Sequence, residues 1–291
     1  MAFKQRLGLY YQLAKPGIIY GNLVTAAAGF LLAAKGDIDW SLFIFTLLGV
    51  ALVIGSACIF NNYTDRGVDS RMTRTKKRAL VSGEISPTRA LVAATIFGLV
   101  GFSILAIHVN LLVTVLAISA SFFYVVIYGL VKRHSVHGAL VGTIPGAAPP
   151  VMGYCAITDH LDGGALILFL ILIFWQMPHF YGIALYRFKE YKAAGLPVMP
   201  TKAGVLSTKI QAIAYMAGFV AAVISLWALG YIGRLCLVII GLAWAYWLWV
   251  AIKNFSNGDS KIWGKKVFLS SLLVNLVFAA SIAFNWLLVK I

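Results

Sequence analysis

The sequence predicts an all-α membrane protein that crosses the bilayer nine times, and three observations support this fold class. The 291 residues are 61% hydrophobic and only 11% charged, a composition that a soluble globular domain does not tolerate. Apolar runs of about 17 or more residues, long enough for a transmembrane helix, recur along the whole chain. Basic residues gather in alternate loops between these runs. We therefore expect a single integral-membrane domain over residues 1–291.

The predicted spans follow the apolar runs in order. We place the nine helices near residues 18–34, 41–61, 90–108, 111–128, 138–157, 164–185, 210–230, 235–252 and 267–289.

The basic residues predict the orientation of these spans, since cytoplasmic loops carry the excess of Lys and Arg. Of the 24 basic residues, all but Lys35, Arg234 and Lys290 fall on the side that holds the N-terminus. We expect a cytoplasmic (bacterial inner) membrane protein with its N-terminus and long basic loops in the cytoplasm and its C-terminus outside. The net charge of +15 then reflects topology and anionic ligands, and nothing in it requires nucleic acid.

The first half of the chain begins with an amphipathic lead-in over residues 1–17. It ends at Lys15-Pro16, and Pro16 suits the first turn of the first span. The second span leads into a long basic loop, 62–89, and Ser86-Pro87 resembles the start of the third span. The fourth span carries Tyr124 and Tyr128 one turn apart.

The fifth span holds Pro145, Pro149 and Pro150, so we expect it to be bent or broken, as membranes accept where a cavity or neighbours satisfy the backbone. The sixth ends in the cluster Trp175-Gln176-Met177-Pro178-His179-Phe180-Tyr181. A second basic loop, 186–209, follows it. Because two basic loops stand four helices apart, we expect an internal duplication with the active cavity between the halves.

The most informative stretch is the junction of the second span and its loop. If the chain is helical there, Asn61, Asp65 and Asp69 recur every four residues and lie on one face, each about 6 Å of rise from the next. Mg²⁺ takes oxygen ligands of this kind and keeps waters and substrate phosphates as its other ligands. The alternative is a solvated, salt-bridged loop. Ionisable groups at the end of an uncharged span favour function, and the neighbouring cations favour a metal–diphosphate site.

Other polar and aromatic residues have a simpler interpretation beside the functional one. Tyr124 and Tyr128 are typical of an interfacial belt or a core, or they line a pocket and shield a cationic intermediate. His179 is either a hydrogen-bonded structural residue or a substrate contact.

These motifs resemble a known family. The pattern Asn61-x-x-x-Asp65-x-x-x-Asp69, followed by residues 72–80, is similar to the first motif of the UbiA-type intramembrane prenyltransferases. Residues 175–180, continued by 190–197, resemble the haem O synthase branch of that superfamily. The similarity extends over nearly the whole chain, including Lys15-Pro16 and Pro149-Pro150.

The resemblance implies a nine-helix bundle around a central cavity that opens to the cytoplasm and to lipid. It also implies the reaction, in which farnesyl diphosphate is joined to a vinyl group of protohaem IX (haem B), giving haem O and diphosphate. The bound metal is Mg²⁺, held through the diphosphate, and haem B is a substrate. A terminal oxidase or a further haem-modifying enzyme would receive the product.

The site residues that we expect fall into four sets. The metal and catalytic set is Asn61, Asp65 and Asp69. The candidates for diphosphate or haem propionates are Arg66, Arg74, Lys77, Arg78, Lys132 and Arg133. The prenyl and cation pocket is Tyr124, Tyr128 and Tyr181. The haem end is Trp175, Gln176 and His179, with His179 as axial ligand or polar anchor.

The sequence departs from the superfamily pattern after the sixth span, where relatives acting on aromatic acids or quinone precursors carry a second aspartate-rich motif. Here Glu190 is the only carboxylate in that loop, which leaves a second metal site open. Two rival functions remain: prenyl transfer to an aromatic or quinone precursor, and a haem carrier or transporter. A carrier has no need of Asn61, Asp65 and Asp69 to release diphosphate.

Overall fold

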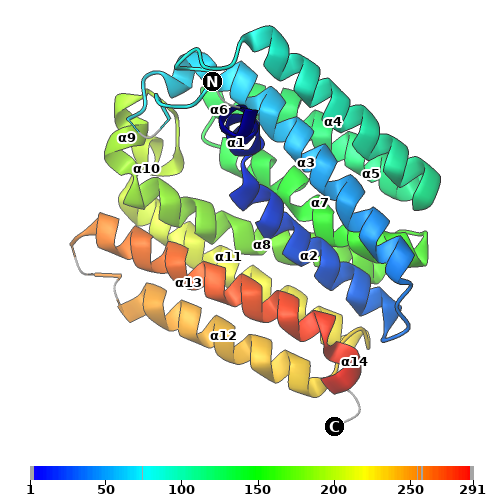
Figure 1. Ribbon diagram of the computed structural model, residues 1–291. Coiled ribbons are helices and arrows are strands. Elements are labelled where there is room, and N and C mark those ends of the chain that lie inside the picture. Colours follow the sequence, from blue (N-terminus) through cyan, green and yellow to red (C-terminus); the bar gives the residue numbers. More distant parts are fainter. Residues whose placement is uncertain (1–2, 74, 254, 257, 289–291) are drawn as a thin grey trace.

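The computed structural model describes residues 3–73, 75–253, 255–256 and 258–288. Arg74, predicted as a phosphate or propionate contact, lies outside these ranges. Every regular element in the described residues is a helix, and the long helices pack side by side in one bundle (Figure 1). The predicted all-α class is therefore confirmed.

Nine long helical segments of the described chain are apolar enough to cross a membrane. They are α2 (Pro16–Ala34), α3 (Trp40–Asp69), α4 (Pro87–His108), the continuous run of α5 (Leu111–Phe122), η1 (Phe123–Ile127) and α6 (Tyr128–His134), α7 (Gly138–Thr158), α8 (Gly163–Tyr186), α11 (Gly204–Ala228), α12 (Arg234–Lys253) and α13 (Ser260–Ala283). The short helices are α1 (Phe3–Leu13), α9 (Phe188–Ala193), α10 (Met199–Lys202) and α14 (Asn285–Leu288).

Several predicted boundaries were wrong. The second span does not end near residue 61, because α3 continues to Asp69, and the fourth continues past residue 128 to His134. The last span begins at Ser260 and ends at Ala283, earlier than 267–289. The predicted boundaries follow the ends of the apolar runs, but the backbone hydrogen bonds of a helix can continue past the last apolar residue. The fifth span is not broken either, since α7 runs without interruption and keeps its three prolines inside.

The bundle is built on close helix pairs. α3 packs along α4, α2 along α7, and α8 against α7, α11 and α13. Small residues make the closest approaches: Gly29 meets the Pro150 carbonyl, and Gly182 meets Gly264. Such pairs let transmembrane helices approach through their backbones, where apolar lipid offers no hydrophobic drive.

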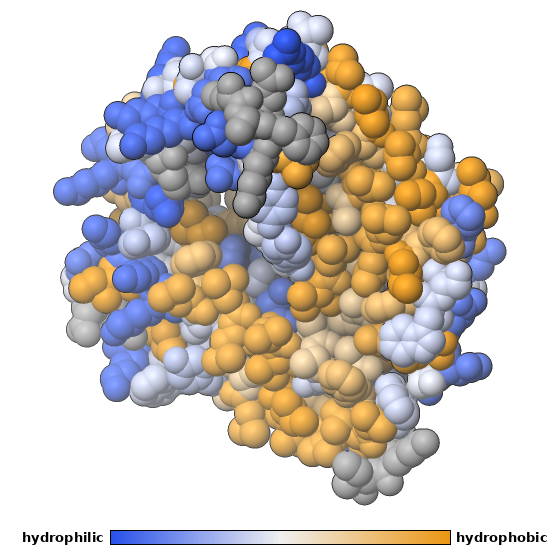
Figure 2. All heavy atoms as spheres, in the orientation of Figure 1, coloured by the Kyte–Doolittle hydropathy of each residue, from blue (hydrophilic) through white to orange (hydrophobic). Residues whose placement is uncertain are grey.

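The surface matches a membrane-embedded bundle with one polar end. Apolar side chains cover the broad middle of the face shown in Figure 2, and hydrophilic residues gather over the end that carries α6, α9 and α10 in Figure 1. The same face is hollowed below this polar end, with hydrophilic residues inside the recess. The helix ends that border the recess carry the site described next.

Candidate active site

The oxygen-bearing face predicted for the second span is present on α3. The helix persists through Asp69, so Asn61, Asp65 and Asp69 recur at intervals of four residues along one side of it. Asn61 and Asp69 are buried and Asp65 is half-buried. Each of the three side chains meets a cation that comes from a different part of the chain.

Asn61 is paired with Lys15, which lies at the junction of α1 and α2. The Lys15 ammonium donates to Asn61 Oδ1 at 2.7 Å. Lys15 adopts a left-handed backbone conformation with φ 56°, just before Pro16 begins α2, and this turn directs the chain from one helix into the next. Burial lowers the pKa of Lys15 to about 8, and the nearby Arg78 acts in the same direction, against the opposing effect of Asp65.

Asp65 is paired with two cations of α6. Lys132 Nζ lies 2.5 Å from Asp65 Oδ2, and Arg133 Nη2 lies 3.3 Å from Oδ1. Arg133 also donates to the carbonyl of Thr64 at 2.6 Å. Predicted phosphate-binding residues and a predicted metal ligand are thus brought together from positions almost 70 residues apart.

Asp69 is paired with Arg78 from the loop that follows α3. Arg78 Nη1 lies 2.5 Å from Asp69 Oδ2 and 3.0 Å from Asn62 Oδ1. Asn62 in turn donates to the Leu13 carbonyl at 2.7 Å. Through this chain of contacts the loop, α3 and α1 are held to one another beside the carboxylates.

The other predicted cations of the loop lie elsewhere. Arg66 and Lys77 are exposed, and among the described residues neither forms an ion pair with Asp65 or Asp69. Arg66 instead lies over the Tyr63 ring, 4.4 Å from its centroid. The structure therefore divides the predicted set into Arg78, Lys132 and Arg133 at the carboxylates and two cations at the surface.

Tyr124 and Tyr128 lie beside this charged cluster. Their rings stack with centroids 5.7 Å apart, and the Lys132 ammonium lies 4.8 Å from the Tyr128 ring centroid. Tyr124 belongs to η1, a single π-helical turn inside the fourth span, and such turns are frequent at functional sites because they redirect side chains. Lys132 therefore connects this pair of rings to Asp65.

The haem-end residues on α8 make neutral contacts. Trp175 Nε1 donates to the Ser271 carbonyl at 2.7 Å, and His179 Nδ1 lies 2.7 Å from the Ser271 hydroxyl. The His179 ring also packs against Trp175 and Phe268, with centroids 4.9 Å and 5.0 Å away. One polar residue of α13 therefore orients both predicted haem contacts.

Gln176 and Tyr181 face other neighbours. Gln176 is buried and donates to the Thr143 carbonyl of α7 at 3.2 Å. The Tyr181 hydroxyl donates to Gln211 on α11 at 3.0 Å, away from the contacts of the stacked tyrosines. Tyr181 was expected with Tyr124 and Tyr128, and the structure does not bring it to them.

Three buried polar atoms of the described residues have no hydrogen-bond partner: Asn61 Nδ2, Glu190 Oε2 and Asn275 Oδ1. The other Glu190 oxygen accepts from Arg187 at 3.1 Å. Leaving such atoms unpaired costs free energy, so each is a candidate for a bond to a bound molecule. Glu190 lies in the loop that follows α8, and Asn61 lies where the apolar part of α3 ends.

Sequence reasoning did not predict Lys15, Asn62 and Ser271 as contacts of the site residues, and it did not single out Asn275, whose side-chain oxygen is unpaired. Lys15 and Asn62 bear no pattern of their own, since their roles depend on contacts between distant segments. Ser271 and Asn275 did offer a signal. They are polar residues four apart, hence on one face of an apolar span, and polar groups inside a membrane usually have a function.

The oxygen donors of α3 suit Mg²⁺. Two carboxylates and an amide on one face are hard ligands, and an unpaired amide nitrogen beside them suits a phosphate oxygen. The described residues contain no group of three or more His, Cys, Asp or Glu side chains that would enclose a metal ion alone.

Comparison with known proteins identifies related sequences over nearly the full chain. The model of the UbiA prenyltransferase family matches residues 22–288. A protoheme IX farnesyltransferase of Sodalis glossinidius (strain morsitans) is 49% identical over 266 residues, covering 91% of this chain and 90% of the relative. A protein of the same name from Cronobacter sakazakii (strain ATCC BAA-894) is 48% identical over 265 residues, covering 91% and 90%.

Solved structures share the fold. A structure of digeranylgeranylglyceryl phosphate synthase superposes with a TM-score of 0.81 at 16% identity, covering 99% of this chain and 100% of the other. A UbiA homologue from Archaeoglobus fulgidus bound to GPP and Mg²⁺ gives a TM-score of 0.71 at 19% identity, covering 97% and 100%. At these identities the likeness concerns the nine-helix fold alone.

Proposed function

The chain belongs to the UbiA prenyltransferase family, and from this premise we propose that it transfers a farnesyl group from farnesyl diphosphate to a vinyl group of protohaem IX. The product carries the hydroxyethylfarnesyl group of haem O, so farnesyl and the elements of water are added across the vinyl bond while diphosphate leaves. The choice of haem as acceptor is supported by relatives at 48–49% identity that are named protoheme IX farnesyltransferase.

One structural observation supports the prenyl-transfer chemistry above all. Three side-chain oxygens on one face of α3 are surrounded by Lys15, Arg78 and Lys132, which three different segments contribute. Breaking the bond between the first prenyl carbon and oxygen leaves negative charge on the diphosphate. Fixed cations at that point stabilise the transition state more than the ground state.

Asn61, Asp65 and Asp69 would hold Mg²⁺, which the diphosphate shares. When bound, the ion supplies positive charge to the departing phosphate oxygens. Lys132, Arg133 and Arg78 are at present paired with the carboxylates. With Mg²⁺ balancing the carboxylates, these cations would be free to contact the diphosphate.

The prenyl cation would form beside the stacked pair Tyr124 and Tyr128. Aromatic faces attract positive charge, and an apolar surrounding keeps water from quenching the cation before the acceptor does. On the other side, the haem ring would lie against Trp175 and His179, held by Ser271 from behind. Attack by the vinyl group then forms the carbon–carbon bond, and water completes the product.

The site opens toward the cytoplasmic side of a bacterial inner membrane. The distribution of basic residues among the loops supports this orientation. Both loops of the site, after α3 and α8, are on that side together with the N-terminus. A terminal oxidase or a further haem-modifying enzyme receives haem O.

The deciding experiment is a product assay. Membranes containing the protein receive haem B, farnesyl diphosphate and Mg²⁺, and the extracted haem is analysed by chromatography and mass spectrometry. We expect a farnesylated, hydrated haem that disappears with Asp65→Asn. Consumption of farnesyl diphosphate with unchanged haem would point to another acceptor, such as 4-hydroxybenzoate, and movement of haem without any product would point to a carrier.

A further inference from the structure

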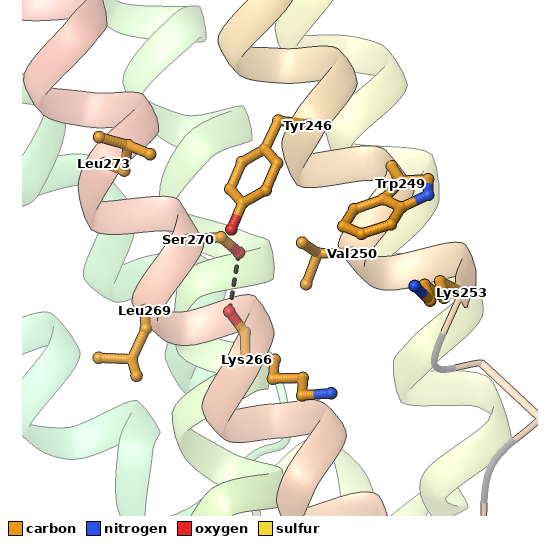
Figure 3. A pocket seen from close by; sticks show the side chains of 8 residues that line it. All are labelled: Tyr246, Trp249, Val250, Lys253, Lys266, Leu269, Ser270 and Leu273. Carbon is orange, nitrogen blue, oxygen red and sulfur yellow. Dashed lines mark hydrogen bonds between the residues drawn. The ribbon is translucent and has the colours of Figure 1, made fainter.

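A groove between α12 and α13 lies outside the candidate active site. It has a volume of about 410 Å³ and is walled by Tyr246, Trp249 and Lys253 of α12 and by Lys266, Leu269 and Leu273 of α13 (Figure 3). None of these lining residues has a role in the reaction proposed above. The groove therefore needs an explanation of its own.

The two walls have the same pattern. On α12 the lining positions are spaced three, four and seven residues after Tyr246, and on α13 they follow Lys266 at the same intervals. Because the helices are antiparallel, Lys253 and Lys266 both lie toward the end of the groove where α12 finishes and α13 begins, while Tyr246 and Leu273 lie toward the other end (Figure 3). The groove is thus cationic at one end and apolar along the rest.

The floor is dry. Val250 is only 6% exposed and Ser270 likewise 6%, and the Ser270 hydroxyl donates to the Lys266 carbonyl of its own helix at 2.8 Å. By contrast, Trp249, Leu269 and Leu273 are about half exposed along the walls. A molecule in the groove would therefore meet apolar surface and no unsatisfied polar atom below the lysines.

The location restricts the occupant. Both lining stretches lie within helices that are apolar enough to span a membrane, so the groove opens toward lipid. The Lys253 ammonium lies 4.5 Å from the Trp249 ring centroid, and the Tyr246 and Trp249 rings lie 6.1 Å apart. Aromatic rings with lysines are typical of the depth at which lipid headgroups begin.

We propose that this groove binds an anionic phospholipid. Its phosphate lies between Lys253 and Lys266, and one acyl chain follows Leu269 and Leu273 toward the bilayer centre. Basic pockets between transmembrane helices recognise acidic headgroups in this way. A zwitterionic lipid brings its own ammonium group to the same place and loses that advantage.

The test is lipid binding to the purified full-length protein, measured by native mass spectrometry in neutral detergent. Phosphatidylglycerol and phosphatidylcholine are titrated against the wild type, against Lys253→Gln/Lys266→Gln, and against the control Lys261→Gln/Lys265→Gln. The control removes the same charge from exposed positions of α13 that do not line the groove. We expect phosphatidylglycerol to bind roughly thirtyfold more weakly to the groove variant, since each of the two lysines near a headgroup adds about a fivefold preference.

Several outcomes would overturn the proposal. Equal losses in both double variants would mean general attraction to a basic surface, and equal binding of phosphatidylcholine would remove the headgroup preference. Displacement of the lipid by haem, or by formation of a dimer, would assign the groove to that other occupant. The thermal transition in detergent without added lipid shows whether both variants are folded, and Leu269→Trp, which fills the groove without changing charge, should also exclude the lipid.

Discussion

The end of α3 and the end of α8 lie four spans apart, and their side chains are paired in opposite ways. At α3 the side-chain oxygens of Asn61, Asp65 and Asp69 pair with the cations Lys15, Lys132 and Arg78. At α8 the side chains of Trp175 and His179 meet a serine hydroxyl, a carbonyl and aromatic rings. The first arrangement can exchange its ion pairs for a charged ligand, whereas we propose that the second receives the flat, largely apolar acceptor.

On the function proposed above, this contrast suits two substrates of different chemistry. Ion pairs near a membrane are strong but respond to any new charge, so they suit a diphosphate that enters and leaves. Neutral hydrogen bonds and ring contacts are directional and insensitive to charge, so they suit an acceptor that must present one vinyl group. Variants at the two ends should therefore affect different substrates.

The largest expected effect comes from Asp65→Asn, which keeps the shape of the side chain and removes its charge. Farnesyl transfer should fall by about a hundredfold or more, as when one charge-stabilising group is lost from a transition state. Turnover is measured across a series of Mg²⁺ concentrations, with haem absorbance as a check on folding. Normal turnover at an unchanged Mg²⁺ requirement would remove Asp65 from the metal site.

Arg78→Met should have the next largest effect. It leaves Asp69 and Asn62 without their shared cation, and a hydrogen bond to a charged group contributes enough for about a tenfold change or more. We expect the KM for farnesyl diphosphate to rise while the KM for haem stays the same. Lys77→Met is the matched control, because Lys77 is exposed in the same loop; an equal rise there would show a general charge effect.

His179→Ala tests the other end. The loss of the ring removes contacts to Trp175, Phe268 and Ser271, and haem should be retained about tenfold less well, by the scale of one buried hydrogen bond with its ring contacts. Haem absorbance after purification and the KM for haem give the readouts. A higher KM for farnesyl diphosphate with unaltered haem binding would reverse the proposed division between the two ends.

Ser271→Ala is expected to have the smallest effect. It removes one hydroxyl partner of His179 but leaves the carbonyl that holds Trp175, so haem affinity should fall roughly fivefold, the scale of one net hydrogen bond. Ser270→Ala, one residue away and bonded within its own helix, serves as the control. Equal behaviour of the two variants would mean that Ser271 does not position His179.

The sequence predicted the α3 face because its evidence is local: a period of four residues is enough to align Asn61, Asp65 and Asp69 once the helix persists. It did not reveal Lys15, whose partner is 46 residues away, since no local pattern records which distant segment comes close. Tyr181 shows the same limit for aromatics. It was expected in the prenyl pocket with Tyr124 and Tyr128, but packing places it against Gln211 of α11.

Helix ends were predicted less well than helix identities. Apolar content located all nine spans, yet α3, α6 and α13 extend beyond the ranges predicted from the apolar runs. At these ends, backbone hydrogen bonding and capping decide where the helix begins or stops. Asp259, for example, caps α13 by accepting from Lys261 at 2.9 Å. The prolines of α7 were misleading for a related reason: close neighbours hold that helix continuous despite the missing donors.

Every side chain in the ionic cluster of α3 comes from the first half of the chain, between Lys15 and Arg133. During synthesis these residues leave the ribosome within the first four spans, before α8 and α13 exist. The charges that a lone span would carry into the bilayer can thus neutralise one another while the nascent protein is still being inserted. The half of the site that is most costly to expose to lipid is also the half that can be assembled first.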